Sequence, residues 1–496
     1  MPVPFKKDPT DYNQRKLLAE NVFDLLPGDH DCFVYEDIFS QIDTSQLEKK
    51  YSMLGQHAYH PRLITSILIY AYSQGIFSSR KIEQKCSQDL SFMYISHANC
   101  PNFRVLADFR KDNWKFFKSC FAQSVAIAKS LGMISLGHVS LDGSKFYANT
   151  SKHKAANYKR LKEAEARLSK EIEDLIKKAE SADSAEDKIY HNGKGYSIPE
   201  DLKIKKDRLL KIKKVKKELE DRQKKARPNE DIKDSSQISY ADTDAKIMKH
   251  NGSFEYCYNG QISVDSKNQI IIGQHLTQNE NDKAELTPAL ADIKDSTGAL
   301  PDKISLDRGY ATANNIEALT DSKVDGYIAA GRGEKENLPD STKKIGRLNF
   351  SYDGPKDEFI CPAGHKLELK SIGKNRIYKA KGKVCLACLY NKRCAFNRKN
   401  IPTIYADDKA IILSAMAQKM KNNSSKAIYA KRKAIVEPVF GQIKTGGFRR
   451  FSLRGFKKAG GEFSLVCCVS NFKKIVSKIK SEINCIKEAE LVPAVS

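Results

Sequence analysis

Residues 136–147, LGHVSLDGSKFY, decide the fold class, because their apolar and β-branched residues predict a strand that ends in Asp142 and a glycine. Two further strands are predicted at 256–265 (YCYNGQISVD) and 269–276 (QIIIGQHL), and the turn SKN between them indicates a hairpin. A fourth short strand, KISLDRGY, is predicted at 303–310.

Helices separate the later strands, most clearly at 283–292, and this alternation indicates an α/β layer rather than an all-β sandwich. The chain has 496 residues, which is enough for about three domains of ~100–200 residues each. Lysine and arginine number 85 against 61 acids, and the net charge of +24 predicts a polyanionic partner, nucleic acid ahead of an acidic membrane surface. A basic protein with a well-solvated surface is the plainer interpretation of the same charge.

The sequence predicts neither a signal segment nor a membrane-spanning helix. The N-terminal residues MPVPFKKDPTDY contain no hydrophobic signal core. The longest apolar run, near Leu63–Tyr72, is shorter than the ~20 residues that cross a bilayer. We therefore expect a cytoplasmic, nucleoid-associated protein.

Residues 31–130 are predicted to form an all-α DNA-binding domain, preceded by an extension at 1–30. Pro61 is placed to start a helix whose apolar residues recur at spacings of three and four. Gly75 breaks this pattern, and a serine at 78 or 79 can cap a second helix, which gives a helix–turn–helix. Two packed helices without DNA contact explain the pattern equally well. The candidate DNA-binding residues of the second helix are Arg80, Lys81 and Lys85.

A charged segment at 152–248 predicts a helical hairpin inserted after the first strand. Apolar residues recur at spacings of three, four or seven from Tyr158 to Leu175 and from Leu202 to Leu219, with the polar turn HNGKGYS between the two runs. Ser197 with Glu200 forms a capping box for the second helix. The lysines of the hairpin could touch phosphates, although solvated helix faces explain them equally well.

Asp142 and Asp307 have similar surroundings, SLDGSK and SLDRGY, in which each acid follows a short apolar segment. Two carboxylates at adjacent strand ends would form an oxygen-rich site for magnesium or manganese. Taken singly, either acid could be an ordinary turn residue, because Asp-Gly is a common turn signal.

A third acid, Glu437, lies in the segment YAKRKAIVEPVFGQIK at 429–444 and shares one helical face with Lys444. Pro438 fits poorly in a helix interior, so we expect the helix either to start or to be kinked at this point. A surface ladder of ion pairs is the plainer explanation, but it does not account for an acid and a proline within the apolar stretch VEPVF.

These residues resemble the DDE transposases of bacterial insertion sequences, and the resemblance extends from about residue 31 to residue 480. The segments that carry it, in the family's order, are RLITSILIYAYSQGIFSSRKIEQ, DGSKFYANTSKHKA, YNGQISVD, LDRGY, VEPVFGQIK and FRRFSLRG. The resemblance implies an RNase H-like core in which Asp142 and Asp307 bind metal and Glu437 is the catalytic glutamate.

The resemblance also implies the chemistry and the partners. In the family, one metal ion activates water or a DNA 3′-hydroxyl while the other stabilises the leaving oxygen, so no protein nucleophile is needed. We therefore expect Mg²⁺ or Mn²⁺ as cofactor. The expected partners are double-stranded DNA, as terminal inverted repeats and as target DNA, and a second copy of the chain on that DNA.

Tyr429 and Lys444 match the tyrosine and lysine of the family's signature around the glutamate, and with Arg432 they are candidates for DNA contact. Lys444 could contact a backbone phosphate, a role suited to a point charge. The signature arginine is expected four residues before the glutamate, where this chain has Lys433, and Arg432 lies one position earlier. This departure leaves the role of Arg432 open.

A second constellation runs from FICPAGH to CLACLYNKRC. Its thiols would suffice for a closed tetrahedral zinc site, with His365 as a spare ligand. The long gap between Cys361 and Cys385 leaves a set of reduced cysteines without metal as the alternative. The candidate zinc ligands are Cys361, Cys385, Cys388 and Cys394.

The segment FRRFSLRGFKK at 448–458 interleaves phenylalanines with cations, a mixture suited to DNA backbone contact and to stacking on exposed bases. An apolar stripe from Phe463 to Ile479 predicts a last helix that packs in the core. The candidate DNA-binding residues of the cationic segment are Arg449, Arg450 and Arg454.

The predicted protein is thus an α/β protein with an RNase H-like core, an N-terminal all-α DNA-binding domain, a helical-hairpin insertion and a small cysteine-containing insertion. The predicted parts are 1–30 (extension), 31–130 (helical domain), 131–151, 249–340 and 426–496 (core), 152–248 (hairpin) and 341–425 (cysteine-containing insertion). The predicted function is cleavage of insertion-sequence ends and strand transfer. There are two alternatives. The protein could be an RNase H-like nuclease without strand transfer, or a domesticated copy that is a non-catalytic basic DNA-binding protein.

Overall fold

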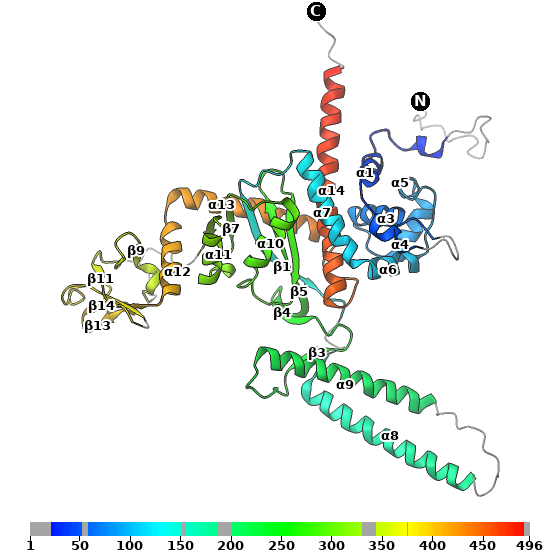
Figure 1. Cartoon of the computed structure of the whole chain (residues 1–496), viewed down its shortest axis with the longest axis horizontal. Coiled ribbons are helices and arrows are strands. Elements are labelled where there is room, and N and C mark those ends of the chain that lie inside the picture. The colour runs from blue at the N-terminus through cyan, green and yellow to red at the C-terminus, as the bar shows by residue number, and fades with distance from the viewer. Residues whose placement is uncertain are drawn as a thin grey trace, which may run out of the picture. The chain divides into compact units, whose positions relative to one another are not determined.

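The computed structural model describes residues 21–51, 58–150, 155–186, 200–329, 344–373 and 375–490. In these residues the chain is a mixed α/β protein that divides into two compact units (Figure 1). The first unit contains the described residues up to Asp112 together with those from Val469 onward, and the second contains Asn113–Cys468. Among the described residues, no helix combines the length and apolarity needed to cross a membrane.

The first unit is helical. Pro61 occupies the first turn of α3, as predicted, and the buried residues of this helix include Ile64, Ile67 and Leu68. The aromatic rings of Tyr35, Tyr70 and Phe92 pack edge to face in the core. Its helices are α1 (Asp31–Ser40), α2 (Ser45–Glu48), α3 (Pro61–Ser73), α4 (Ser79–Gln88), α5 (Leu90–Ile95), α6 (Phe103–Asp112) and the second part of α14 (Phe456–Glu490).

Gly75 has a φ of 71° and so forms the left-handed turn between α3 and α4. The last helix, α14, buries Phe463, Val469 and Phe472, which confirms its predicted place in the core. Within the first unit, Phe472 packs edge to face on Phe39. The fold of this unit therefore depends on residues from both ends of the sequence.

The second unit is built on a mixed sheet with the strand order β4-β5-β1-β7-β8, and β6 pairs with β5. β1 is antiparallel to β5 and parallel to β7, and β7 is parallel to β8. The predicted hairpin corresponds to β5 and β6, which are antiparallel. The strands are β1 (Val139–Tyr147), β4 (Lys246–His250), β5 (Ser253–Asp265), β6 (Ile271–Thr277), β7 (Lys303–Leu306) and β8 (Asp325–Ile328).

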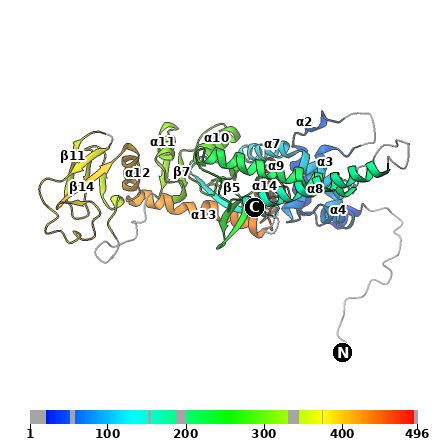
Figure 2. The same ribbon diagram turned by 90° about the horizontal axis from the view of Figure 1, so that it is seen from below.

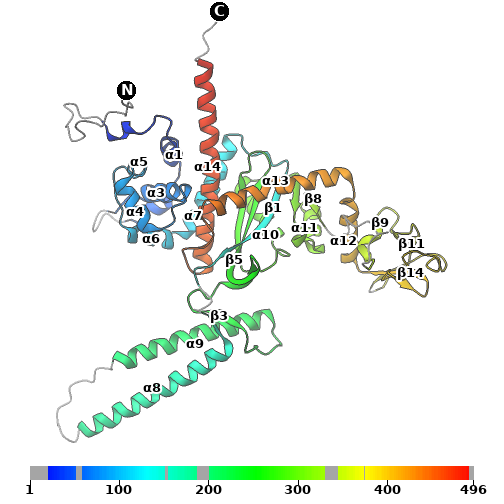
Figure 3. The same ribbon diagram turned by 180° about the vertical axis from the view of Figure 1, so that it is seen from behind.

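Helices cover both faces of this sheet. α10 (Leu286–Thr297) packs on β5 and β6 and α11 (Ala313–Asp321) packs on β8, on one face of the sheet, while α13 (Asn423–Thr445) lies on the other (Figure 2). α7 (Trp114–Ser130) packs against α10. Seen from behind, α13 runs across β1 (Figure 3). Alternate side chains of β1 therefore face α13.

The sequence predicted either a helix start or a kink at Pro438. α13 continues through Pro438, so the prediction of a helix start there is wrong. Proline has no N–H to donate, so the carbonyl of Ala434, four residues earlier, loses its helical partner. That carbonyl instead accepts a hydrogen bond from Gln269 Nε2 at 2.9 Å. Glu437 thus keeps a helical position despite the proline that follows it.

Two long helices, α8 (Tyr158–Glu186) and α9 (Glu200–Ala226), lie side by side (Figures 1 and 3). The short strands β2 (Ala155–Asn157) and β3 (Gln237–Ser239) pair antiparallel at their base. The buried residues between the helices include Leu161, Leu168, Ile212, Val215 and Leu219. The predicted turn HNGKGYS and the predicted cap Ser197 lie outside the described residues.

A second sheet lies between β8 and α13 in the sequence and has its own apolar core, which includes Phe359, Leu367 and Tyr378. Its strand order is β13-β14-β12-β11-β10-β9, and α12 (Asp408–Lys419) follows it. The strands are β9 (Ser351–Asp353), β10 (Glu358–Ile360), β11 (Lys366–Ser371), β12 (Arg376–Lys379), β13 (Asn397–Arg398) and β14 (Ile401–Ala406).

Candidate active site

Asp142 lies in β1, and Asp307 directly follows the neighbouring parallel strand β7. β1 pairs with β7 only as far as Leu141 and Leu306, so the two acids follow the last paired residues side by side. β1 does not end at Asp142, as the sequence predicted, because β5 continues to pair with it up to Tyr147. Asp142 therefore lies where the sheet opens between β1 and β7.

Glu437 and the two aspartates all lie near the guanidinium of one arginine, Arg432. Arg432 Nη1 lies 3.2 Å from Asp142 Oδ2, and Arg432 Nη2 lies 3.6 Å from Asp307 Oδ1 and 3.7 Å from Glu437 Oε1. The side chain of Arg432 is only 7% exposed, whereas those of Asp307 and Glu437 are each 51% exposed. The structure thus brings together all three acids that the sequence singled out, around a single guanidinium.

The electrostatics of the group reflect this crowding. Burial raises the pKa of Asp142 to about 6, against the opposing effect of Arg432. The charge of Asp307 raises the pKa of Asp142 further. Burial lowers the pKa of Arg432, but the surrounding carboxylates outweigh it and the net shift is upward. Arg432 therefore stays charged and partly neutralises the group.

The donor set fits a hard divalent cation, since magnesium and manganese prefer carboxylate oxygens. Within the described ranges, no group of three or more His, Cys, Asp or Glu is arranged to hold a metal ion as it stands. The guanidinium of Arg432 lies between the carboxylates, and its Nε is buried without a hydrogen-bond partner. The carboxylates already converge on one cation, so the residues suit a metal once the guanidinium moves aside.

The other signature residues lie on the same helix. Lys444 Nζ donates to Ser144 Oγ at 2.6 Å, two residues along β1 from Asp142, and burial lowers the pKa of Lys444. The Tyr429 ring lies 5.9 Å from the guanidinium carbon of Arg432. Lys433, at the expected arginine position, is exposed. Arg432, not Lys433, faces the acids.

Sequence reasoning missed a fourth acid beside this group. Asp282 Oδ1 accepts hydrogen bonds from Asn259 Nδ2 at 2.8 Å and from Gln261 Nε2 at 2.6 Å. The hydroxyl of the buried Tyr310 donates to Gln261 Oε1. The motif YNGQISVD contains both amide donors, but the sequence offered it only as a strand, and Asp282 lies in a loop without periodicity.

The predicted DNA-binding residues of α4 are exposed. Arg80 lies over the Phe103 ring at 4.9 Å. Lys85 forms an ion pair with Asp89 at 3.0 Å. Only Lys81 of the three has no such contact described, and DNA contact by this helix stays a prediction.

The cationic segment at 448–458 differs from its prediction. Phe448 and Phe451 are 2% and 1% exposed and pack on each other and on Phe146, so they are core residues and cannot stack on DNA bases. Arginine side chains of the segment are exposed, and two of them donate to backbone carbonyls of residues 148–150. These exposed residues are Arg449, Arg450 and Arg454.

Of the four candidate zinc ligands, one follows β10 directly and three lie between β12 and β13, and among the described residues they are not arranged to hold a metal ion as they stand. Cys361 and Cys385 are buried, and Cys388 and Cys394 are partly exposed. Burial raises the pKa of Cys385 to about 11, and the other three thiols contribute to the rise, so the four are electrostatic neighbours. Backbone N–H groups of His365 and Tyr390 donate to the sulfurs of Cys361 and Cys388 at 3.3 and 3.4 Å.

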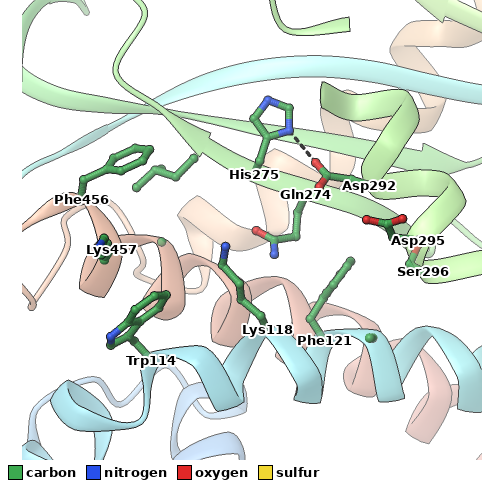
Figure 4. A pocket seen from close by; sticks show the side chains of 13 residues that line it. Trp114, Lys118, Phe121, Gln274, His275, Asp292, Asp295, Ser296, Phe456 and Lys457 are labelled. Atoms are coloured by element: carbon green, nitrogen blue, oxygen red, sulfur yellow. Dashed lines mark hydrogen bonds and ion pairs between the residues drawn. The ribbon is translucent and has the colours of Figure 1, made fainter. Parts of the chain in front are cut away.

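A separate pocket of about 460 Å³ adjoins β6, α7, α10 and the start of α14 (Figure 4). His275 at its edge lies 2.7 Å from Asp292 and 3.0 Å from Glu285. Burial lowers the pKa of His275, but hydrogen bonds to the two acids outweigh it and raise that pKa to about 9. The aromatic and cationic residues of the pocket are Trp114, Lys118, Phe121, Phe456 and Lys457.

Comparisons with known proteins match two segments of the chain. Residues 20–112 match the family described as a transposase domain (DUF772), and residues 360–476 match the transposase DDE domain. The second match contains Glu437 and the cysteine-rich segment, whereas Asp142 and Asp307 lie outside both matches. No curated protein matches the chain. The two matches thus identify the chain as similar to the DDE transposases of insertion sequences, with an N-terminal helical transposase domain and a DDE domain.

Proposed function

We propose that this protein is a transposase that cleaves DNA at the ends of an insertion sequence and transfers the cut strands into target DNA. One observation carries the proposal: Asp142, Asp307 and Glu437, which are far apart in the sequence, converge on one guanidinium. The mixed sheet with helices on both faces supports an RNase H-like core. The two transposase-domain matches support the same class.

Asp142, Asp307 and Glu437 would hold Mg²⁺ or Mn²⁺, because their oxygens suit hard divalent cations. Such ions, when bound, activate a water or a 3′-hydroxyl and stabilise the leaving oxygen of an in-line phosphoryl transfer. The side chains of the protein would position the metal ions and the DNA. Asp142 lies on β1 and Glu437 on α13, so the packing of α13 on the sheet sets the distance between the two backbone positions that carry these carboxylates.

Arg432 and Lys444 would act on the DNA backbone. Arg432 partly neutralises the acids in the metal-free protein, and a bound cation that takes over this role would free its guanidinium for a phosphate. Lys444 is held beside β1 by Ser144, so its ammonium lies near the strand that carries Asp142. A planar guanidinium and a point charge can both bind phosphate oxygens.

The partners follow from the charge and from the reaction. A net charge of +24 suits double-stranded DNA. We propose end recognition by Arg80, Lys81 and Lys85, and backbone contact by Tyr429 and by Arg449, Arg450 and Arg454. Joining two ends to one target requires two active sites, so we propose a homodimer on DNA, in the cytoplasm at the nucleoid.

We further propose that Cys361, Cys385, Cys388 and Cys394 bind one structural zinc. Thiolates are the ligands of closed tetrahedral zinc sites. The sulfurs of Cys361 and Cys388 accept hydrogen bonds from backbone N–H groups, as ligand sulfurs in a metal site can. The zinc would stabilise the small second sheet.

The test uses linear DNA that carries the sequences flanking the gene, together with a supercoiled target plasmid and Mg²⁺. We expect products in which the 3′ ends of the linear DNA are joined to the plasmid. Cut ends without joined products would instead make the protein a nuclease. Binding without cutting would make it a DNA-binding protein.

A further inference from the structure

Asp282 is fixed in place by neutral donors on β5. Asn259 Nδ2 and Gln261 Nε2 both donate to its Oδ1, at 2.8 and 2.6 Å. The carboxylate of Asp282 can only accept, so the amide nitrogen of Gln261 must face it, and the amide oxygen then accepts from the Tyr310 hydroxyl. The loop before α10 thus presents a carboxylate at a defined point.

That point lies against β1 beside Asp142 and against the short 3-10 helix (Arg308–Tyr310) that follows Asp307. A Cβ atom on Gly143, the residue after Asp142, would lie 2.7 Å from Asp282 Oδ1. A Cβ atom on Gly309, two residues after Asp307, would lie 3.2 Å from Asp282 Oδ2. The glycines of SLDG and SLDRG therefore allow Asp282 to approach both β1 and the 3-10 helix after Asp307, which gives these two glycines a common function.

Asp282 forms no ion pair with a cationic side chain in the described part of the chain. Arg432 forms ion pairs with the other three acids and none with Asp282. An asparagine could accept the same two hydrogen bonds without adding a like charge beside Asp142 and Asp307, so the hydrogen bonds alone do not require an acid. The buried guanidinium between the other carboxylates shows that this place accommodates a cation.

We propose that Asp282 is the fourth acid of the site, a positioning residue whose charge strengthens divalent-cation binding by Asp142, Asp307 and Glu437. The inference rests on the proposed function and adds to it a residue outside the three acids. Asp282 acts through the electric field at the site, which it approaches closely beside Gly143 and Gly309. Near a divalent ion, one charge is readily worth a tenfold change in affinity.

The test measures the binding of Mn²⁺ alone to the full-length protein by titration calorimetry. We expect Asp282→Asn and Asp282→Ala to weaken Mn²⁺ binding by about tenfold or more. Asp295→Asn removes the same charge from the last turn of α10 and should bind Mn²⁺ as the wild type does. Asp142→Asn, which removes a proposed ligand, sets the scale of a full loss. Thermal unfolding without metal shows whether each variant is folded.

The two Asp282 variants separate a charge role from a structural one. Asp282→Asn keeps the acceptor of both hydrogen bonds, so a structural role would spare its Mn²⁺ affinity and affect only Asp282→Ala. Wild-type affinity in Asp282→Asn, with a loss in Asp142→Asn, would overturn the inference and leave the proposed function intact. A wild-type protein that binds no Mn²⁺, or binds it equally well without Asp142, would overturn both.

Discussion

At the scale of single residues, Arg432 is the cation around which the candidate site is arranged. Its guanidinium lies 3.2, 3.6 and 3.7 Å from oxygens of Asp142, Asp307 and Glu437. Without it, three like charges would face one another across a partly buried space. The metal-free site therefore depends on Arg432, whereas a metal-bound site would not.

We expect Arg432→Met to lower the free energy of unfolding of the metal-free protein by about 2 kcal/mol, less than the ~3–5 kcal/mol of a fully buried pair because two of the acids are half exposed. Mn²⁺ should then stabilise this variant more than it stabilises the wild type. Thermal unfolding with and without Mn²⁺ measures both effects. Lys433→Met, which changes the exposed neighbour, is the control, and equal behaviour of the two variants would contradict this role of Arg432.

His275 makes the stability of the second unit depend on pH. Burial opposes its charge, but Asp292 and Glu285 raise its pKa in the folded protein to about 9, above the ordinary value of 6.5. The stabilisation is thus fully present below pH 6.5 and is lost as the pH rises through 9. We expect the melting temperature to fall over this range, and His275→Gln to remove most of that fall. An unchanged pH dependence in His275→Gln would show that other groups cause it.

The sequence predicted the acids of the site but not the residue that holds them. Strand patterns and turn signals made Asp142 and Asp307 candidates, a helical face made Glu437 one, and the resemblance to the DDE transposases chose them over ordinary turn and surface residues. Arg432 and Lys433, however, differ by about 100° around a helix. Only the packing of α13 on the sheet decides which of the two faces the acids, and no local pattern encodes that rotation.

At the scale of elements, the sequence predicted the main strands but misplaced their ends. β1 continues past Asp142 because β5 pairs with it up to Tyr147. The strand predicted at 303–310 ends at Leu306 because β1 pairs with it only that far. Strand ends depend on partners that are distant in sequence, so local periodicity cannot locate them. For the same reason the sequence did not indicate Asp282, whose hydrogen-bond partners lie on β5.

The small second sheet provides a prediction about metal content. We expect the purified protein to contain one tightly held zinc per chain, because four neighbouring thiols suit a tetrahedral site. Replacing Cys385 and Cys388 with serine should remove the zinc and increase proteolysis near residues 350–400. Replacing the exposed Cys100 and Cys485 with serine is the matched control. Absence of zinc, with all four thiols freely alkylated in the native protein, would refute the site.

At the scale of the whole molecule, the first unit includes the C-terminal part of α14. Phe472 packs on Phe39, and Lys480 pairs with Asp31, so a fragment that stops before α14 would lose part of its core. Sequence periodicity predicted that α14 packs in the core but not that it completes the N-terminal unit, since that contact joins residues hundreds of positions apart. DNA binding by this unit is therefore best measured on the full chain.

We expect the triple change of Arg80, Lys81 and Lys85 to alanine to reduce the preference for the flanking end sequences over random duplex by about tenfold or more, if each lost base contact costs about 1–3 kcal/mol. The control changes Lys213, Lys214 and Lys217 of α9 to alanine, which removes the same charge. Affinities for both DNAs at physiological salt give the ratio. An equal loss for end and random DNA would assign α4 to non-specific phosphate contact.

The central claim is that Asp142, Asp307 and Glu437 form one metal-dependent cutting site. The direct measurement is the cleavage rate of DNA carrying the flanking end sequences, in Mg²⁺, for the wild type, Asp142→Asn, Asp307→Asn and Glu437→Gln, with Asp295→Asn as control. Each single change should lower the rate by orders of magnitude while DNA binding persists, and a double change should be scarcely worse, because groups that act as a unit are not additive. Rapid cleavage by Glu437→Gln, or additive losses in the double variant, would contradict the account.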